Sequence, residues 1–379
     1  MIIAVLNESA NDTRVAMTPN VVKHYLKLGL KVQCEKNAGI ASGFTDKSYE
    51  EAGAAIIKDR KQLLQQADIL ACVQAPDPKD LDELKSQALL IAPLDNEPDS
   101  PLIKWCMKQS ISAFSMNLVP RITRAQGMDS LSSQANLAGY RAVLEAVCHF
   151  KRAIPMMMTA AGMIHPAKIL ILGAGVAGLQ AIATAKRLGG VIYAFDVRRA
   201  AKEQVESLGA EFIEVEMEED SETSGGYAKE MSEDYKRQQS ELIAKYVAQS
   251  DIVVTTALIP GRQAPLLITK TMVETMKPGS VIVDLATSRG GNCELSQCDK
   301  VTLHNEITII GYSNMAGFIP ATASELYANN ILNLVKTLAT SPEALDFKED
   351  DEIMKQALLC HQNKYLPFQS IPSKETVHA

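Results

Sequence analysis

The sequence predicts an α/β protein with two Rossmann-like domains, each built around a doubly wound parallel sheet. Strand-like apolar runs alternate with helix-like periodicity along most of the 379 residues. One such unit, Lys168 to Asp196, has a glycine-rich loop between its first strand and its helix. The length suits two domains. We expect residues 1–131 to form the first domain, completed by helices within residues 313–379, and residues 132–312 to form the second.

The composition is that of an ordinary globular protein without a nucleic-acid-binding surface. Hydrophobic residues make up 46% and charged residues 22%, a usual balance for such a protein. The net charge is −7, and no basic stripe is present to neutralise a phosphate backbone. The N-terminus lacks the basic start of a signal peptide, so we expect a first strand and a cytoplasmic protein. The seven cysteines and six histidines lack paired or metal-ligand spacing, which indicates reduced thiols and no metal.

The first domain is expected to alternate strands and helices. A helix should begin after Thr18 as N-cap, with Pro19 in its first position and Gly29 just past its end. This segment of the sequence has no glycine-rich phosphate loop. Its strand-like runs are Ile2–Leu6, Lys31–Glu35, Ala54–Ile57, Ile69–Gln74, Leu89–Leu94 and Ile111–Asn117.

A helix from Leu131 to His149 is expected to connect the two domains. A later helix, Ala323 to Leu338, is long enough to return to the first domain. The residues after Thr340 are polar and include Pro367 and Pro372, which indicates a peripheral helix and a tail. Besides Lys168 to Asp196, the strand-like runs of the second domain are Phe212–Val215, Ile252–Thr255, Val281–Leu285 and Ile307–Gly311.

Each glycine of the loop has a steric reason. Gly173 allows a sharp turn out of the strand, Gly175 leaves room for a pyrophosphate, and Gly178 lets helix and strand pack closely. The pyrophosphate would face the N–H groups and the positive dipole at the helix N-terminus. Asp196 ends the second strand, where a carboxylate would bind both hydroxyls of an adenosine ribose and repel a 2′-phosphate. The pattern therefore favours NAD(H) over NADP(H).

Other interpretations of this stretch stay open. Ile169–Ala185 is almost free of polar side chains, so a buried helical hairpin or a membrane span is the alternative, although a span needs ~20 residues. Arg198 and Arg199 could bind a 2′-phosphate. Because Asp196 precedes them, we expect them to be solvated or to face the adenine.

A polar insertion, residues 214–245, separates two strand-like runs. Its acidic residues are typical of a solvated surface. Its centre, Gly225-Gly226-Tyr227, combines chain flexibility with an aromatic side chain. This combination predicts the tip of a lid over a binding site, and a plain surface loop is the alternative.

Five stretches carry a family resemblance. The first is RITRAQGMDSLSSQANLAGYRA, from Arg121 to Ala142, and the others are Gly173–Leu188, Gly225–Met231, Thr255–Gly261 and Gly290–Cys293. Together they resemble the NAD(H)-binding component, domain I, of the proton-translocating nicotinamide nucleotide transhydrogenases. The resemblance covers about residues 1–330, and its first stretch is far more specific than the glycine loop.

The resemblance implies a homodimeric two-domain subunit with NAD(H) in a cofactor cleft between the domains. It implies docking onto an NADP(H)-binding component and a membrane-spanning proton-channel subunit, peripheral to the inner membrane. The implied activity is Si-face-specific hydride transfer between NADH and NADP⁺, coupled to proton translocation and absent without the partners. The implied catalytic positions are Arg121, Gln126, Asp129, Ser132, Tyr140 and Tyr227. The implied nucleotide contacts are Gly173, Gly175, Val176, Ala177, Gly178, Asp196, Val197, Arg198, Gly226, Ala257, Leu258 and Asn292.

The chemistry of hydride transfer is compatible with these residues. Transfer between two nicotinamides moves no substrate proton, so the site needs no nucleophile or general base, only two rings with their C4 atoms ~3–3.5 Å apart. The neutral amide of Gln126 can hydrogen-bond both partners, and Arg121 and Asp129 can pair to fix the turn. The simpler alternative is a solvated turn before a helix, capped by Ser132 or Ser133.

Alanine dehydrogenases are the nearest alternative family, because they share the two-domain plan and the motif from Arg14 to Pro19. Such an enzyme needs a cation for a substrate carboxylate and an acid/base histidine. Here Val73–Pro76 stands where a lysine is expected, and Ala92–Asp95 stands where a His-Leu-Ala type sequence is expected. Arg14 is therefore expected to be a packing or salt-bridge residue. The sequence also departs from the transhydrogenase pattern at Asn7-Glu8 and in the basic stretch Ala286–Arg289.

A non-catalytic NAD-binding module is a third alternative.

The sequence contains one glycine-rich nucleotide loop. As a transhydrogenase component, the chain alone is therefore expected to bind NADH without completing turnover.

Overall fold

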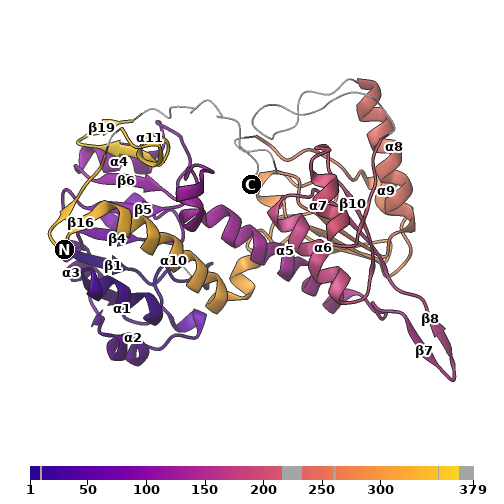
Figure 1. The fold of residues 1–379 in the computed structure, drawn as a ribbon, viewed down its shortest axis with the longest axis horizontal. Coiled ribbons are helices and arrows are strands. Elements are labelled where there is room, and N and C mark those ends of the chain that lie inside the picture. Colours follow the sequence, from indigo (N-terminus) through magenta and orange to yellow (C-terminus); the bar gives the residue numbers. More distant parts are fainter. Residues whose placement is uncertain (9–10, 216–232, 259–261, 349, 367–379) are drawn as a thin grey trace. The chain divides into compact units, whose positions relative to one another are not determined.

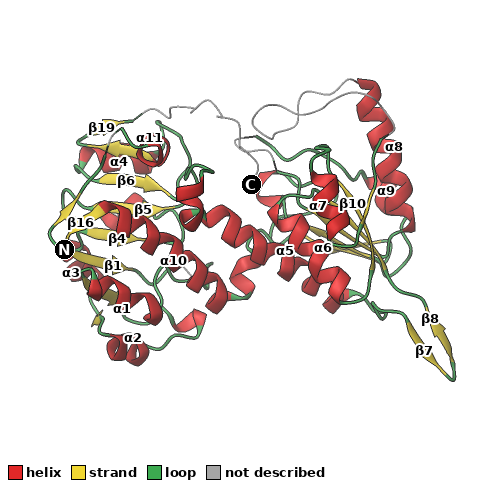
Figure 2. Ribbon diagram, in the orientation of Figure 1, coloured by secondary structure: helices red, strands yellow, loops and turns green. Residues whose placement is uncertain are grey.

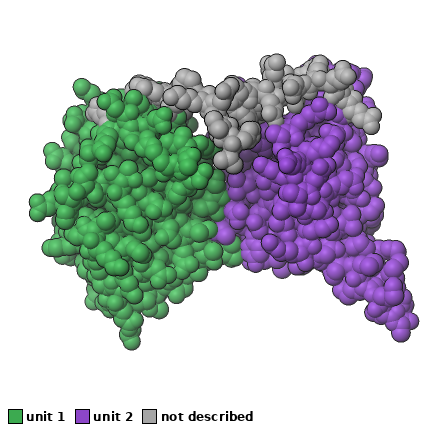
Figure 3. All heavy atoms as spheres, viewed as in Figure 1, with its two compact units in different colours: residues 1–134, 317–372 green, residues 135–316, 373–379 purple. Residues whose placement is uncertain are grey.

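The computed structural model describes residues 1–8, 11–215, 233–258, 262–348 and 350–366. They form two compact units, which Figure 3 colours separately. Unit 1 contains the described residues of 1–134 and 317–366, and unit 2 contains those of 135–316. Each unit has a main sheet of mostly parallel strands covered by helices (Figure 2), so the predicted α/β fold class is confirmed.

Unit 1 is built on a sheet with the strand order β19-β18-β6-β5-β4-β1-β2-β3 (Figure 1). Strands β1 to β6 are parallel, and the order reverses between β1 and β4. Their Val, Ile and Leu runs are buried on both faces, which is typical of a parallel sheet. The bounds are β1 Ile2–Val5, β2 Lys31–Glu35, β3 Ala55–Ile57, β4 Ile69–Ala71, β5 Leu89–Ala92 and β6 Ser112–Ser115.

Helices cover both faces of this sheet. Ile3 of β1 packs in one core with Tyr25 and Ile331, and Ala4 faces a second core with Leu64 and Ile103. The helices and 3₁₀ turns are α1 Pro19–Lys27, η1 Ile40–Ser42, α2 Asp46–Ala52, α3 Arg60–Gln66, η2 Pro78–Leu81, α4 Pro101–Lys108, η3 Thr123–Met128, α10 Pro320–Leu338 and α11 Glu352–Ala357.

Helix α1 begins and ends where the sequence predicts, but its N-cap is incomplete. Pro19 is in the first turn, and Gly29 past the end has φ +78°. The hydroxyl of Thr18, at the N-cap position, makes no capping hydrogen bond and is buried without a partner among the described atoms. The cap is therefore positional, without the side-chain bond that usually accompanies it.

The C-terminal segment of unit 1 differs from the predicted peripheral helix and tail. Besides α11, it contains β16 Ala339–Ser341, β17 Ala344–Leu345, β18 Leu358–His361 and β19 Lys364–Tyr365. Strand β18 is mostly buried and pairs antiparallel with β6, so β18 and its neighbour β19 belong to the main sheet, whereas β16 and β17 form a separate two-stranded sheet. The prediction was wrong because this short strand is defined by a partner that lies far away in the sequence.

Unit 2 is built on a sheet with the order β11-β10-β9-β12-β13-β15-β14; of these described strands, only β14 is antiparallel to its neighbour. This is a Rossmann order with its reversal between β9 and β12. The bounds are β9 Lys168–Leu172, β10 Val191–Phe195, β11 Glu211–Phe212, β12 Ile252–Thr255, β13 Val281–Asp284, β14 Val301–His304 and β15 Ile307–Ile310.

Helices also cover both faces of the unit 2 sheet. Ile182 and Val205 pack in one core, and Ile243 and Val273 pack in the core on the other face. The elements are α5 Ser130–His149, α6 Val176–Arg187, α7 Ala201–Ser207, α8 Glu233–Gln249, α9 Lys270–Glu274, η4 Thr287–Arg289 and η5 Met315–Phe318. A boundary between the units falls within α5, and another falls within η5. The stretch after Ile169 is thus strand, loop and helix of one Rossmann unit, which excludes the alternative of a helical hairpin. No described helix combines the length and the apolar character needed to cross a membrane.

A hairpin that the sequence did not predict projects from unit 2 (Figure 1). Its strands are β7 Met157–Thr159 and β8 Gly162–Ile164, paired antiparallel. It carries exposed apolar side chains, including Met158 (79% exposed) and Met163 (50%). Such a patch is more apolar than an ordinary surface turn.

Candidate functional site

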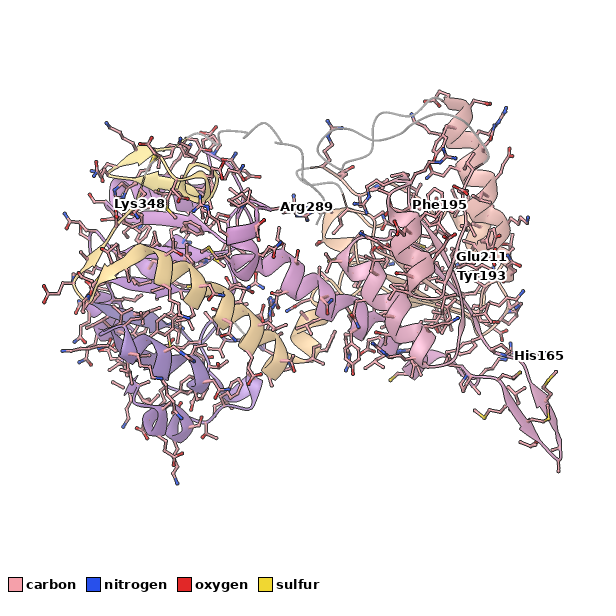
Figure 4. All side chains as sticks on the ribbon, viewed as in Figure 1. His165, Tyr193, Phe195, Glu211, Arg289 and Lys348 are labelled. Atoms are coloured by element: carbon pink, nitrogen blue, oxygen red, sulfur yellow. The ribbon has the colours of Figure 1, made fainter. Side chains whose placement is uncertain are left out.

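The glycine loop of unit 2 joins β9 to α6, and each glycine has the steric setting that the sequence predicts. Gly173 has φ +103°, and its N–H donates to the carbonyl of Phe195 (2.8 Å), the last residue of β10 and labelled in Figure 4. A Cβ on Gly178 would overlap the carbonyl oxygen of Gly173. A Cβ on Gly175, the N-cap of α6, would meet nothing within 4 Å. The loop therefore combines tight internal packing with bare backbone at a helix N-terminus.

Asp196 follows β10 and is tied to this loop. Its carboxylate accepts from the N–H of Ala174 (2.7 Å) and from the guanidinium of Arg198 through Nε and Nη2 (both 2.9 Å). Burial opposes ionisation, but the hydrogen bonds from Arg198 and Ala174 and the charge of Arg198 outweigh it and lower the pKa of Asp196. Arg198 thus forms an ion pair with Asp196 although its side chain is 32% exposed, and Nε of Arg199 lies 3.9 Å from Oε2 of Glu214. The expectation that these arginines face the adenine stays a prediction.

The turn after β12 packs against the glycine loop. Thr256 donates through Oγ1 to the carbonyl of Gly173 (3.1 Å). The fully buried amide of Asn292 accepts from the N–H of Ala257 (3.0 Å) and donates to the carbonyls of Ala257 (2.9 Å) and Pro265 (2.8 Å). Leu258 is 49% exposed. The Asn292 amide therefore holds this turn in place.

Helix α5 crosses the start of α6 at Gly139, a residue that the sequence prediction missed. A Cβ on Gly139 would overlap the carbonyl oxygen of Ala177, in the first turn of α6. Tyr140 is the next residue on α5, and its side chain is 38% exposed. The available signal was a glycine inside a helical pattern, which often marks a close backbone approach.

The turn from Arg121 to Asp129 precedes α5 in unit 1. Within η3 the side chains of Ala125 and Met128 are buried, whereas Arg121 and Gln126 are exposed. The turn therefore exposes the guanidinium of Arg121 and the amide of Gln126, while the buried side chains of Ala125 and Met128 hold its backbone against the core.

Asp129 has a different partner from the predicted one. Its carboxylate accepts from the backbone N–H of Ser132 (2.8 Å) and from the Ser132 hydroxyl (2.5 Å). Among the described residues Asp129 and Arg121 form no ion pair, so that expectation was wrong. The physical reason is that the first turn of α5 has free N–H groups beside Asp129, and a carboxylate is a strong acceptor for them. The helix cap is therefore Asp129, not Ser132 or Ser133.

Helix α10 fixes the backbone of η3. The side chains of Asn330 and Asn333 both donate to the carbonyl of Gly127 (2.9 Å each). Asn330 also accepts from the hydroxyl of Ser133 (2.8 Å). These bonds join η3, α5 and α10 within unit 1, so the exposed side chains lie on a rigid turn.

A second polar cluster lies beyond the carboxyl ends of β1 and β4 in unit 1. The guanidinium of Arg14 donates to Asp12 through Nε (3.0 Å) and Nη2 (2.7 Å) and to Gln134 Oε1 (2.8 Å). The amide of Gln74 donates to the same Asp12 carboxylate (2.5 Å). Arg14 is only 11% exposed, so it forms the internal salt bridge that the sequence predicts.

The predicted site residues fall into three groups. Arg121, Gln126, Asp129 and Ser132 lie in unit 1, close together in the chain around η3 and the start of α5. The unit 2 group surrounds the carboxyl ends of β9, β10 and β12, and consists of Tyr140, Gly173, Gly175, Val176, Ala177, Gly178, Asp196, Val197, Arg198, Ala257, Leu258 and Asn292. Gly226 and Tyr227, together with the predicted lid, lie outside the described residues.

Comparisons with known proteins match both halves of the chain. The family "Alanine dehydrogenase/PNT, N-terminal domain" matches residues 4–138, and "Alanine dehydrogenase/PNT, C-terminal domain" matches residues 142–367. The chain is 48% identical over 349 residues to the first portion of the NAD(P) transhydrogenase subunit alpha of Rhodospirillum rubrum, covering 90% of this chain and 91% of the relative. A solved transhydrogenase structure from Sinorhizobium meliloti superposes with a TM-score of 0.84 at 43% identity, covering 97% and 99% of the two chains. A solved L-alanine dehydrogenase gives a TM-score of 0.81 at 26% identity, covering 97% of each chain.

Proposed function

Because the chain belongs to the alanine dehydrogenase/PNT family, we propose that it is the NAD(H)-binding component of a proton-translocating transhydrogenase. The proposed reaction is Si-face-specific hydride transfer between NADH on this chain and NADP⁺ on a partner component, coupled to proton translocation by a membrane subunit. The chain alone would not complete turnover. The identity of 48% to a transhydrogenase subunit supports this proposal over the more distant dehydrogenases.

The observation that carries the proposal is the open backbone at the N-terminus of α6. The position of a Cβ on Gly175 is free of neighbours within 4 Å, while Gly173 and Gly178 pack tightly beside it. A pyrophosphate fits there because it needs bare backbone N–H groups and the positive end of a helix. Asp196 stays ionised beside this loop, where it would accept from ribose hydroxyls and repel a 2′-phosphate. The residues present therefore fit NAD(H).

The proposed roles of the unit 1 residues follow from the chemistry of the transfer. A bound reduced nicotinamide supplies the hydride, and the balanced reaction of NADH with NADP⁺ to NAD⁺ and NADPH releases no proton. The chain therefore has to bind and orient the rings and to exclude water. The exposed amide of Gln126 and guanidinium of Arg121 lie on a turn that α10 fixes, which suits them to position a ring or its carboxamide. We assign Asp129 and Ser132 to the support of that turn.

The hydrogen bonds and the burial of the Arg14 guanidinium disfavour the alternative of an amino-acid dehydrogenase. Such an enzyme must offer a cation to a substrate carboxylate. The Arg14 guanidinium already donates to the carboxylate of Asp12 and to Gln134, and it is largely buried. A substrate carboxylate would have to displace an internal ion pair, and the neutral Gln74 beside it offers no second charge.

We further propose that the chain is a homodimer, peripheral to the inner membrane through its partner subunits. The hairpin of β7 and β8 supports self-association because its exposed methionines form an apolar surface. The Rhodospirillum rubrum relative is itself only a portion of an alpha subunit, which supports the need for separate partners.

A reconstitution experiment tests the proposal. The chain is mixed with an NADP(H)-loaded partner component, and the NADH-dependent reduction of an NADP analogue is followed by absorbance. We expect transfer only when both proteins are present. We expect Gln126→Ala to slow transfer by about a hundredfold, the usual effect of a small misplacement of reacting groups, with unchanged NADH affinity.

The matched control is Asn329→Ala, which changes an exposed amide of α10 whose one hydrogen bond among the described residues is to the carbonyl of Glu325 in the same helix. This variant should transfer hydride at the wild-type rate. Equal rates with and without the chain would overturn the proposed function. Turnover of L-alanine with NAD⁺ by the chain alone would establish the dehydrogenase alternative instead. A normal rate with Gln126→Ala would show that Gln126 does not position the rings, whereas NADH binding without any chain-dependent transfer would favour a non-catalytic module.

A further inference from the structure

Asp284 is a buried carboxylate that none of the predicted functional roles uses. It is the last residue of β13 and has no solvent exposure. One oxygen accepts from the Thr255 hydroxyl (3.1 Å) and from the N–H of Ala286 (2.9 Å). The other accepts from the N–H groups of Asn292 (2.8 Å) and Cys293 (3.0 Å). The Ser296 hydroxyl adds a bond of 2.6 Å to this second oxygen.

Through these hydrogen bonds, Asp284 holds the backbone of the loop formed by residues 286–293. All the groups around Asp284 are donors, and three of them are backbone N–H groups of residues 286–293. Arg289, labelled in Figure 4, lies on this loop, and its carbonyl accepts from Ala264 (2.8 Å). A carboxylate offers acceptor sites on both oxygens to the four donors Thr255, Ala286, Asn292 and Cys293, and it shares the Ser296 hydroxyl with the carbonyl of Cys293. A neutral amide would place its own N–H₂ against at least one of these donors. The charge of Asp284 is therefore needed for this conformation.

The loop of residues 286–293 is connected to the glycine loop through Asn292. The backbone of Asn292 is held by Asp284, and its side-chain amide clamps Ala257 by both N–H and carbonyl. The preceding residue, Thr256, donates to the carbonyl of Gly173. Asp284 thus reaches the phosphate loop in three connected steps, without being exposed itself.

The turn from Thr256 to Leu258 follows β12, so it lies on the half of the Rossmann sheet that does not carry the glycine loop. In this sheet β9 and β10 form the half with the glycine loop and Asp196, whereas β12 and β13 form the other half across the reversal of strand order. The two halves of such a sheet each bind one mononucleotide of a dinucleotide. A residue that positions the turn after β12 should therefore act mainly on the nicotinamide half, with a smaller effect on the adenosine half through the bond from Thr256 to Gly173.

We propose that Asp284 is a positioning residue for the nicotinamide half of the nucleotide site, acting through Asn292 and the turn from Thr256 to Leu258. This inference rests on the proposed binding of NAD(H). Asp284 does not touch the nucleotide. Its role is to keep the turn rigid while the rest of unit 2 stays folded.

Two ligands separate this role from a general structural one. The affinity of the whole chain for NADH is measured by nucleotide fluorescence, and that for 5′-AMP, which occupies only the adenosine half, is measured by calorimetry. For Asp284→Asn we expect the NADH dissociation constant to rise by about tenfold, because buried donors lose their acceptor. The 5′-AMP dissociation constant should change by less than about twofold, because the Asp284 relay touches the adenosine half only through the carbonyl of Gly173. Asn292→Ala removes the clamp but keeps the bonds to Asp284, and it should show the same selective loss even if Asp284→Asn folds poorly.

The matched control is Asp251→Asn. Asp251 is also buried in unit 2, but it precedes β12 and lies at the opposite end of the same strands, where it accepts from Lys168 N (2.9 Å) and Lys277 Nζ (3.2 Å). It should reduce thermal stability without changing either affinity. Wild-type NADH affinity in both Asp284→Asn and Asn292→Ala would overturn the inference, as would equal losses for NADH and 5′-AMP. If the wild-type chain bound 5′-AMP but not NADH, the proposed function itself would fail.

Discussion

The three loop glycines differ at the scale of single residues, although a sequence motif treats them alike. Gly178 packs against the carbonyl of Gly173, so its missing side chain serves the fold. Gly175 faces open space, so packing does not require its missing side chain, and the space is where we propose that a pyrophosphate binds. Stability and binding should therefore respond differently to the same substitution at the two positions.

Alanine at these positions gives a direct test. Gly178→Ala should lower the free energy of unfolding by ~1–3 kcal/mol through overpacking. Gly175→Ala should change it by less than ~0.5 kcal/mol, because its surroundings are open, but should weaken NADH binding by about tenfold. Urea unfolding and fluorescence titration measure the two effects, and each variant is the control for the other. Equal destabilisation by both would contradict this assignment.

Glu8 is the residue whose titration should be visible in stability. Burial raises the pKa of its carboxyl from 4.5 to about 7, with a further increase from Asp12, against the N–H groups of Val73 and Gln74. The folded protein therefore holds this proton more tightly than the unfolded chain. The stabilising contribution is complete below pH 4.5 and is lost as the pH rises to about 7.

Glu8→Gln should remove this pH dependence, because glutamine stays neutral. Relative to the variant, the wild-type free energy of unfolding should fall by up to ~3 kcal/mol between pH 5 and pH 8, since each pKa unit is worth ~1.4 kcal/mol. Urea unfolding across this range measures the difference. Parallel pH profiles for the two proteins would show that Glu8 has an ordinary pKa.

At the scale of elements, two strands after α10, β18 and β19, belong to the unit 1 sheet. Leu358 of β18 is 1% exposed and belongs to the same buried core as β1 and α10. Strand β18 also covers the edge of β6, which would otherwise present unpaired backbone groups. Strand β18 should therefore contribute to stability as a core element does.

Leu358→Ala should lower the free energy of unfolding by ~2–5 kcal/mol, the range for large-to-small changes in a core. The control is Lys364→Ala at the exposed start of β19, for which we expect a change within ~0.5 kcal/mol. Thermal and urea unfolding measure both. A peripheral tail, as the sequence alone suggested, would give small effects in both variants.

At the scale of the whole molecule, the hairpin of β7 and β8 is the feature that a single chain does not explain. Its methionines are exposed although they would be more stable in contact with other apolar groups. Assembly of two chains through this surface would account for them. The homodimer proposed above then depends on a few side chains outside the glycine loop.

Met158→Asp should dissociate such a dimer, because a charge would be buried without a partner. Light scattering should show the mass of one chain instead of two, with unchanged unfolding of the chain itself. Leu303→Asp is the matched control, since Leu303 is similarly exposed (72%) but lies on β14. Retention of the dimer in Met158→Asp would place the contact elsewhere.

The sequence by itself determined the features that depend on neighbouring residues. The α/β alternation, the α1 and α6 boundaries, and the steric roles of Gly173, Gly175 and Gly178 follow from local periodicity and local backbone geometry. The internal salt bridge of Arg14 was also predictable, because the residues that would have given it another role are missing from the sequence.

Only the tertiary structure decided which distant groups meet. The pairing of β18 with β6, the contact of Gly139 with Ala177, and the relay from Asp284 to the glycine loop join residues far apart in the chain. Asp129 shows the same limit at short range, because Arg121 and the α5 N-terminus were both plausible partners. The residue type determines which hydrogen bonds a side chain is able to make. The folded backbone determines which partner lies within hydrogen-bond distance, and a hydrogen bond forms only at that distance and with a suitable angle.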